Sequence, residues 1–533
     1  MVCFTMLSRT GSLPSDPAQL KRMVLALQAE NADLRVYADL LRLMIFGAKS
    51  EKMVALDPAQ IALDLGDLSD IATTGPVAAD DDAPDPNSSR QRNRCAASRN
   101  MGSLPGHLPR HEEVTRPKIT TCPCCNLSLH RIGEDISEAL DIVPALLRVI
   151  RTIRPKYACR GCEAGVIQAS ARAGVMNGGM ATTALVAHVV VAKFARHLPL
   201  YRQAQMLAHA GIDIDRGTLG GWVARAAWWL KPLHERLLGF IRAQPRVFCD
   251  ETPLPRLDPG RGRTKICQLW AQAIDDRPWQ GPAPPAVGYV FTEGRGTDEL
   301  EAQLGRFDGI LQVDGYGAYK SLAKRQRKSN IAPLRLVFCL AHARRKFADV
   351  VKTTGSTEAL AVIGTIAEIY LIEGRIRGLS ADARLSARKA ESVAIMSALK
   401  VQLEQLMAEV SSKSSISKAA AYTLGHWQGL RAFLDDGRIE VDNNIVERSI
   451  KPVCLTRKNA LFAGSKSGGE SWAILASLVN TAKLNDIDPE LWLADILERI
   501  VSGATPINRL DTLLPWTWKA EREALRYNEA LAA

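Results

Sequence analysis

Leucine recurs at every seventh position near the start of the chain, at Leu20, Leu27, Leu34 and Leu41. The positions four residues after these leucines are mostly apolar and include a single Asn31. This pattern predicts a leucine-zipper-like coiled coil within residues 16–52, in which one Asn in the seam fixes register and favours a paired state. The alternative is an amphipathic helix that packs against its own protein. The coiled coil predicts self-association through this segment.

A different pattern, of short apolar runs followed by helical stretches, begins at about residue 241. Strands are predicted at 246–250, 266–274, 286–292, 310–314 and 335–340. Helices are predicted at 298–304, 319–325 and 341–350. The order suits a ribonuclease H-like domain over 241–500, with a helical insertion at about 350–430 that is rich in Ala, Leu and charge. A C-terminal extension would follow at 501–533.

The first and the fourth of these predicted strands each end on a carboxylate. Asp250 closes the first apolar run, and Pro253 is expected to end that strand. Asp314 closes the fourth run and is followed by glycines that allow a sharp turn. A ribonuclease H-like sheet brings these two strand ends together, so the two acids are candidates to hold a divalent cation such as magnesium. The alternative for Asp314 is a turn aspartate that bonds to its own backbone.

A third acid, Glu447, lies in the stretch 442–452, whose pattern predicts a capped helix stopped by its proline. Asn444, Glu447 and Arg448 share one face of that helix. Glu447 is therefore a candidate to complete a three-carboxylate site. The alternative is an exposed ion pair between Glu447 and Lys451, four residues later.

The composition changes twice between the zipper and the predicted core. Residues 53–110 hold many Asp, Pro, Ser and Arg residues and few large apolar ones, which predicts a largely disordered linker. The next segment, 111–170, contains two Cys-x-x-Cys pairs formed by Cys122, Cys125, Cys159 and Cys162. Four thiolates at this spacing predict a tetrahedral structural zinc site, and the alternative is a set of buried thiols.

Residues 171–240 are predicted to form a helical DNA-binding region. A helix over 201–210, a turn at a glycine and a second helix over 215–229 would make a helix-turn-helix. Arg216 and Arg225 on the second helix would then contact DNA phosphates. The alternative is a plain helical hairpin with no role in DNA binding.

Length and charge narrow the class of protein. A chain of 533 residues is too long for one core and predicts several domains. The net charge of +11 and the pI near 9.1 indicate an anionic partner, for which nucleic acid is the first candidate. No run resembles a signal peptide or is long enough to span a bilayer, and eleven cysteines in such a chain favour thiols or metal ligands over disulfides. These features predict a cytoplasmic protein without a membrane partner.

Several short stretches match one known family. They are 46–52 after the zipper, 133–138 and 154–159 around the cysteines, and then 197–202, 250–253, 257–262, 314–316, 341–347, 442–452 and 508–516. Through these stretches, which cover nearly the whole length of the chain, the sequence resembles the insertion sequence 66 family of bacterial transposases. The resemblance implies a DDE-type transposase on a ribonuclease H-like core, with its catalytic triad at Asp250, Asp314 and Glu447.

The resemblance also implies cofactors and partners. Two Mg²⁺ ions, or Mn²⁺, would be held by the three acids, and structural Zn²⁺ by the cysteines. The substrate would be double-stranded DNA, as terminal inverted repeats and as target, with small accessory proteins of the same element as further partners in a nucleoid-associated complex. Besides Arg216 and Arg225, the residues predicted to contact DNA are His342, Arg344, Arg345, Lys346, Asn444, Arg448, Lys451, Arg457 and Lys458. The rival interpretation is a catalytically silent DNA-binding regulator that uses the zipper and the zinc module.

Overall fold

The computed structural model describes residues 149–150, 156–158, 166–168, 173–176, 179–329 and 334–532. The predicted zipper at 16–52, the predicted linker at 53–110 and the four predicted zinc ligands lie outside the described residues. Within the part of the chain that is described, no helix is both long and apolar enough to cross a membrane.

The described residues divide into two units, one that contains residues 156–158 and 166–168 and one that contains the described residues from 173 onward. In the first of these, β1 (Lys156–Ala158) and β2 (Val166–Gln168) form an antiparallel pair. Cys159 and Cys162 fall in the chain that connects the two strands.

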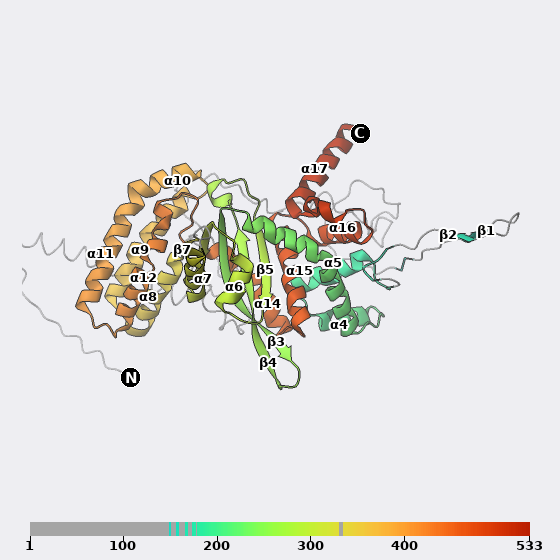
Figure 1. The fold of residues 1–533 in the computed structure, drawn as a ribbon, viewed down its shortest axis with the longest axis horizontal. Coiled ribbons are helices and arrows are strands. Elements are labelled where there is room, and N and C mark those ends of the chain that lie inside the picture. The colour runs from blue at the N-terminus through green and yellow to red at the C-terminus, as the bar shows by residue number, and fades with distance from the viewer. Residues whose placement is uncertain are drawn as a thin grey trace, which may run out of the picture. The chain divides into compact units, whose positions relative to one another are not determined.

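The second unit is built around a five-stranded sheet (Figure 1). Its strands are β3 (Arg246–Asp258), β4 (Arg263–Ile274), β5 (Ala286–Thr292), β6 (Ile310–Val313) and β7 (Arg335–Phe338). They lie in the order β5-β4-β3-β6-β7, where β3, β4 and β5 form an antiparallel meander and β6 and β7 run parallel to β3. The α+β class and the predicted order of strands and helices are thus confirmed.

Helices lie beyond both edges of this sheet (Figure 1). On the side of β5 are α3 (Thr183–Phe194), α4 (Leu200–His209), α5 (Arg216–Arg242), α15 (Lys466–Leu484) and α16 (Pro489–Val501). On the side of β7 lies α8 (Leu340–Thr354), which the sequence predicted as a helix before the insertion. The helices of the predicted insertion follow on the same side, as α9 (Thr357–Ile376), α10 (Ala381–Ala387), α11 (Val393–Glu409), α12 (Ser415–Gly425) and α13 (Trp427–Leu430). The remaining helices are α6 (Thr297–Leu304), α7 (Gly317–Lys328), α14 (Asn444–Ala460) and α17 (Pro515–Ala532).

The outer edge of β5 is closed by side chains of α15. The Thr481 hydroxyl accepts the backbone N–H of Val287 at 3.1 Å, and the Ser477 hydroxyl accepts that of Tyr289 at 2.7 Å. These N–H groups point away from β4 and would otherwise offer an edge for another strand. The sheet is therefore protected on this side, and α15 is fixed against it.

The strand β3 does not end at Asp250, as the sequence predicted, but continues through Pro253 to Asp258. It stays paired with β4 along this extension, whereas β6 pairs only with the first three residues of β3. The carbonyl of Pro255 accepts the N–H of Ala463 at 2.8 Å, on the side away from β4. The backbone nitrogens of Pro253 and Pro255 both point to the side away from β4. The missing N–H groups therefore remove no hydrogen bond from the ladder with β4.

The helix α14 likewise continues past Pro452, where the sequence predicted its end. A proline inside a helix removes the hydrogen bond to the carbonyl four residues earlier. Here the Tyr289 hydroxyl of β5 donates to the neighbouring carbonyl of Ser449, and the buried face of the helix packs across β3 and β4. The helix ends only after Ala460, at Leu461, whose φ is 65°.

A network of buried charges fastens the insertion to the loop before α14. Arg388 donates to both carboxylate oxygens of Glu373, at 2.7 and 2.6 Å, and to the carbonyl of Ile439 at 2.9 Å. Arg384 donates to Glu440 at 2.7 Å and to Glu373 at 3.3 Å. We call Glu373, Arg384, Arg388 and Glu440 the arginine network. All four side chains are buried, so two acids and two arginines balance one another inside the protein.

Candidate active site

The parallel pairing of β3 with β6 aligns two of the predicted catalytic acids. Arg246 lies opposite Ile310 and Phe248 opposite Gln312. Continued for two residues beyond the last pair, the same offset brings Asp250 of β3 level with Asp314, the residue that follows the end of β6. The structure therefore brings together the two acids that the sequence predicted at adjoining strand ends.

The third acid, Glu447, lies one turn into α14, and the start of that helix is tied to both acid-bearing strands. The buried amide of Gln312 in β6 donates to the carbonyls of Glu440 and Asp442, at 2.6 and 2.9 Å. The Asn443 amide donates at 3.2 Å to the carbonyl of Cys249 in β3. These bonds bring the first turn of α14 beside the two strands that carry the other acids.

The electrostatics of Asp250 show that the three acids lie close enough to interact. Burial raises the pKa of Asp250 well above its ordinary value, and the negative charges of Glu251, Asp314 and Glu447 raise it further. Within the described part of the chain, neither Asp250 nor Asp314 forms an ion pair with a basic side chain. The cluster is therefore short of positive charge, which is the condition that favours cation binding.

Glu251 lies beside Asp250 but is occupied by other partners. Arg295 forms an ion pair with its Oε1, and the Tyr319 hydroxyl donates to its Oε2 at 3.1 Å. Its side chain is 2% exposed. This agrees with the alternation of side chains along a strand, which separates Glu251 from the face that holds Asp250.

The turn after Asp314 is shaped by its own carboxylate and by the insertion. Asp314 Oδ1 accepts the N–H of Tyr316 at 2.8 Å, so the residue also makes the turn bond that was its alternative interpretation. The Tyr422 hydroxyl from α12 donates to the Asp314 carbonyl at 3.0 Å. Gly315 has a φ of 106°, and a Cβ there would lie 2.9 Å from the Tyr422 hydroxyl and 3.1 Å from the His426 ring. Only glycine fits this position.

Asp442 is a further acid near the site whose ionisation the sequence did not single out. Burial raises its pKa to about 7, against the effect of the Asn444 N–H, which donates to Oδ1 at 3.1 Å and lowers the pKa. The charges of Glu440 and Glu447 contribute to the rise. Asp442 lines a cavity of about 550 Å³ beneath the insertion, together with Arg377, Arg448 and residues of the arginine network.

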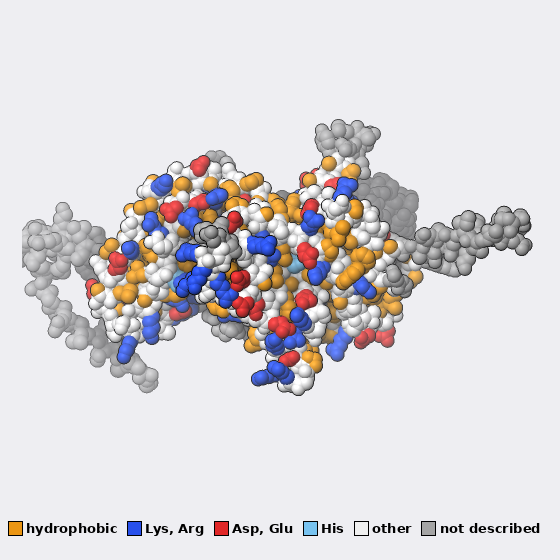
Figure 2. Space-filling view, in the orientation of Figure 1, with side chains coloured by type: hydrophobic (Ala, Val, Ile, Leu, Met, Phe, Trp, Pro, Cys, Tyr) orange, Lys and Arg blue, Asp and Glu red, His pale blue; other side chains and the backbone are white. Residues whose placement is uncertain are grey.

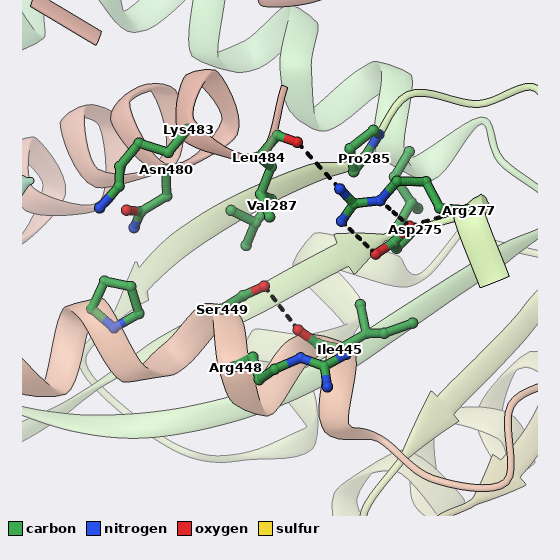
Figure 3. Close-up of a pocket in the computed structure, with 12 residues that line it drawn as sticks. Asp275, Arg277, Pro285, Val287, Ile445, Arg448, Ser449, Asn480, Lys483 and Leu484 are labelled. Atoms are coloured by element: carbon green, nitrogen blue, oxygen red, sulfur yellow. Dashed lines mark hydrogen bonds and ion pairs between the residues drawn. The ribbon is translucent and has the colours of Figure 1, made fainter. Parts of the chain in front are cut away.

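A smaller cavity of about 260 Å³ adjoins the first one and is drawn in Figure 3. Arg448 and Ser449 reach it from α14, and Asn480 and Lys483 from α15. Arg277 closes one end, where Asp275 holds its guanidinium through bonds of 2.9 and 2.8 Å. Arg448 lines both cavities and thus places a cation one residue from Glu447.

The residues predicted to contact DNA are in different environments. On α8, Lys346 is exposed and lies 4.5 Å from the Tyr422 ring, whereas Arg344 is largely buried. On α14, Arg448, Lys451 and Lys458 are exposed. Asn444 and Arg457 are held by the protein itself, since Asn444 is buried and bonded to Asp442 while Arg457 donates to Thr252 and Pro253 in β3. His342 and Arg345 are partly exposed on α8. A DNA contact by any of these residues stays a prediction.

A basic surface that sequence reasoning missed covers α7, which begins three residues after Asp314. Lys and Arg side chains gather over this helix in Figure 2. They include the exposed residues Lys320, Lys324, Arg325, Arg327 and Lys328. The clustering of these residues was visible in the sequence. In the fold, Lys320 lies in the first turn of the helix, whereas the end that carries residues 324–328 packs through Gln326 against the loop before β6, at the opposite end of that strand from Asp314.

The two helices of the predicted helix-turn-helix are present as α4 and α5, joined through Gly211 at a φ of 78°. Asp215 caps α5 by accepting the N–H of Gly217 at 2.6 Å. The second helix is longer than predicted, because its apolar face remains buried as far as Ile241. Arg216 and Arg225 are exposed on it. Whether this pair of helices binds DNA stays a prediction.

Four family models match this chain in sequence order. The model described as "Transposase IS66 family" matches residues 178–471, which include all three acids. The model described as "zinc-finger binding domain of transposase IS66" matches 120–163, which include the four predicted zinc ligands. The model described as "IS66 C-terminal element" matches 477–516, and "Transposase C of IS166 homeodomain" matches 33–112.

Three proteins of Sinorhizobium fredii are among the relatives. The chain is 62% identical to y4jD over 96% of its own length and 98% of that protein. It is 43% identical to y4qI over 80% of its own length and 78% of that protein, and 34% identical to y4hP over 91% and 88%. With a family model that covers the whole sheet and the site, and with near full-length relatives, the chain belongs to the IS66 family of transposases.

Proposed function

We propose that Asp250, Asp314 and Glu447 form one metal-binding set that cleaves DNA at the ends of an insertion sequence and joins it to a target. The observation that carries this proposal is the alignment of Asp250 with Asp314 by the β3–β6 register, with Glu447 near enough to raise the pKa of Asp250. The strand order β5-β4-β3-β6-β7, with the acids on β3, after β6 and on a later helix, supports a ribonuclease H-like core.

The three acids fit magnesium, or manganese, as the cofactor. Carboxylate oxygens are the ligands that these ions prefer, and the cluster lacks cations of its own. Bound there, the metal would neutralise charge on a phosphodiester and make a hydroxyl a stronger nucleophile for in-line attack. The chain supplies the positioning, because Gly315 and Tyr422 set the turn of Asp314 while Gln312 and Asn443 set the start of α14.

Basic residues around the acids would hold the DNA backbone. Arg448 and Lys451 on α14, Lys346 on α8 and Lys320 in the first turn of α7 are exposed cations on the elements that carry or follow the acids. Recognition of the terminal inverted repeats would fall to the zinc module and to the α4–α5 pair. A structural zinc at Cys122, Cys125, Cys159 and Cys162 accompanies this assignment.

Assembly and location complete the proposal. Residues 16–52 would pair two copies of the chain, and small accessory proteins of the same element would join the complex. The protein would act in the cytoplasm, associated with the nucleoid.

The experiment is a strand-transfer assay with purified full-length protein and DNA that carries the terminal repeats of its element, with and without the accessory proteins. We expect cleaved and joined products in Mg²⁺ or Mn²⁺ and none in EDTA. Asp314→Asn should bind the same DNA and yield no product. Repeat-specific binding by the wild-type protein, with no metal-dependent product in either arm, would contradict catalysis and favour the silent regulator.

A further inference from the structure

A cysteine, a histidine and the third catalytic acid meet where α8 begins beside α14. Cys339 precedes the first residue of α8, His342 lies one turn later, and Glu447 faces them from α14. One ligand atom from each residue lies within 4.8 Å of the other two. The nearest measured approach is 3.6 Å, between His342 Nδ1 and Glu447 Oε1. A sulfur, an imidazole nitrogen and a carboxylate oxygen therefore converge on one point.

The surroundings of the Cys339 sulfur favour its protonated form on balance, so a bound metal would have to displace that proton. Burial raises the pKa of the Cys339 thiol well above its ordinary value, while the backbone N–H groups of His342 and Asn443 act on the sulfur in the opposite direction. The Asn443 N–H donates to it at 3.2 Å. Such an N–H donor would stabilise the thiolate once a metal has displaced the proton. His342 Nδ1 is shielded from solvent and has no hydrogen-bond partner in the described part of the chain.

The donor set selects a class of metal. Thiolate and imidazole suit zinc and other late first-row transition metals, whereas magnesium takes oxygen ligands. Zinc–ligand bonds of about 2.0–2.3 Å place the ligand atoms of a tetrahedral site about 3.3–3.8 Å apart. The His342–Glu447 separation of 3.6 Å already fits, and the bound of 4.8 Å leaves the sulfur at most about 1 Å to move.

We propose that Cys339, His342 and Glu447 form a zinc site that withdraws Glu447 from the magnesium set and thereby inhibits the enzyme. The three residues provide three ligands and leave a fourth position open to solvent or to a DNA phosphate. Binding of zinc does not depend on the catalytic assignment, whereas inhibition rests on the proposed function. The two consequences are therefore measured separately.

The first experiment measures metal content. Full-length protein with its cysteine module loaded is equilibrated with Zn²⁺, passed through a desalting column and assayed for zinc per chain. The wild-type protein should hold one zinc more than Cys339→Ser, and Cys267→Ser, which changes a buried cysteine on β4 outside the cluster, should match the wild type. Equal zinc in the wild type and Cys339→Ser would overturn the proposal.

A second variant guards against misfolding of Cys339→Ser. His342 is 24% exposed, so His342→Gln disturbs the core less. In a titration with Co²⁺, the wild type should develop a sulfur-to-cobalt absorption band, and His342→Gln should need at least ~10-fold more Co²⁺ to reach it, since even the loss of a residue that only supports a ligand costs about 10–100-fold in affinity. An unchanged titration in His342→Gln would overturn the proposal even if Cys339→Ser does not fold.

The second experiment measures inhibition of Mg²⁺-dependent cleavage by Zn²⁺. The zinc concentration that halves the rate should be at least tenfold higher for Cys339→Ser than for the wild type or Cys267→Ser, because removing a ligand weakens zinc by at least that factor. Equal sensitivity of all three proteins would exclude inhibition through this site. A wild-type protein that binds the extra zinc but cleaves no DNA would refute the proposed function and leave the zinc site standing.

Discussion

Two clusters of buried charge lie close together in this protein and are organised in opposite ways. In the arginine network, burial alone would raise the pKa of Glu440, but the charges of Arg384, Arg246, Arg377 and Arg388 together lower it. At the acid cluster, burial and neighbouring acids act in the same direction and raise the pKa of Asp250. Acids withdrawn from solvent are therefore neutralised by arginines in one place and gathered as an excess of negative charge in the other.

The arginine network, in which the charges balance, holds the backbone that leads to the unbalanced cluster of Asp250, Asp314 and Glu447. Arg388 bonds to carbonyls of Phe433, Asp436 and Ile439, in the segment that leads to α14. Gln312 then holds the carbonyls of Glu440 and Asp442 against β6. Pairing in the network holds the backbone before α14 in place, and with it the position of Glu447, which raises the pKa of Asp250 and has His342 Nδ1 3.6 Å from its Oε1. The clusters therefore differ in charge balance, because the arginine network carries its own cations and the acid cluster is raised in pKa by its neighbouring acids.

The largest effect should come from removing one acid of the unbalanced cluster. Asp250→Asn, Asp314→Asn and Glu447→Gln should each lower strand transfer by on the order of 10³-fold or more, because the three residues act as one unit. Combining two of these changes should cost little beyond either alone. Binding to terminal-repeat DNA, measured by mobility shift, should stay nearly intact.

The neighbouring acid provides the control for that prediction. Glu251→Gln should have a milder effect on strand transfer, since Glu251 is bonded to Arg295 and Tyr319 and not to the cluster. A near-normal rate of strand transfer by Glu447→Gln would show that Glu447 is not part of the catalytic set. The proposed difference between the two clusters would then be wrong.

A substitution in the arginine network should lower the free energy of unfolding. Arg388→Met leaves the buried carboxylate of Glu373 short of its main partner, and the free energy of unfolding should fall by about 3–5 kcal/mol. The matched control is Arg375→Met, which breaks an exposed pair with Glu391 and should cost less than about 1 kcal/mol. Urea unfolding of the three proteins tests this, and equal losses in both variants would show that the network is not a stabilising element.

The pH dependence of stability should separate two acids that stand only two residues apart. The pKa of Asp442 in the folded protein is raised to about 7. Between about pH 4 and pH 7 the folded protein therefore keeps a proton on Asp442 that the unfolded chain has lost, and the contribution of Asp442 to the free energy of unfolding falls as the pH rises through this range. Asp442→Asn should therefore be more stable than the wild type at pH 8, by on the order of 3 kcal/mol, with the gap closing toward pH 4. The buried Oδ1 of Asn444, which has no partner within the described residues, can accept from the new amide.

The control for the pH prediction is Glu440, whose pKa is lowered. Its contribution is present above the ordinary glutamate pKa and is lost as the pH falls through the lowered value. Glu440→Gln should therefore be less stable than the wild type at pH 8 and approach it in acid. Urea unfolding between pH 4 and pH 8 measures both variants, and slopes of the same sign would contradict the opposite pKa shifts of Asp442 and Glu440.

A backbone change at the turn after Asp314 should have a smaller effect. Gly315→Ala forces a side chain into a left-handed position and against the Tyr422 hydroxyl. We expect strand transfer to fall about tenfold or more, since a small misplacement of a reacting group costs up to about 10²-fold, while DNA binding is kept. Gly317→Ala is the matched control, because nothing lies within 4 Å of its added Cβ, and its rate should stay near that of the wild type.

The smallest effect concerns the cation beside the unbalanced cluster. Arg448→Ala should weaken DNA binding modestly and reduce the slope of log affinity against log salt concentration by about 1, which is the loss of one phosphate contact. Lys400→Ala, on the insertion helix α11, is the control and should leave the slope unchanged. Equal slopes for Arg448→Ala and the wild type would remove Arg448 from the DNA interface.

The sequence by itself determined the parts of this protein that follow from local pattern. Short apolar runs located all five strands of the sheet, and the acids Asp250 and Asp314 stood out because each follows such a run. The family resemblance extended this to Glu447, which has no such local signal. These inferences succeed because a buried strand needs apolar residues wherever it lies in the fold.

Only the tertiary structure decided the rest. The prolines at 253 and 452 predicted two ends that do not occur, because a missing N–H breaks an element only where a partner would need it, and neighbouring elements decide that. The placement of Glu447 depends on Gln312 and Asn443, which contact residues more than a hundred positions away. The balance of charge was decided in the same way, since an arginine neutralises whichever acid the fold brings to it. Local pattern therefore locates the acids, and long-range packing decides which of them are paired with a basic side chain and which are not.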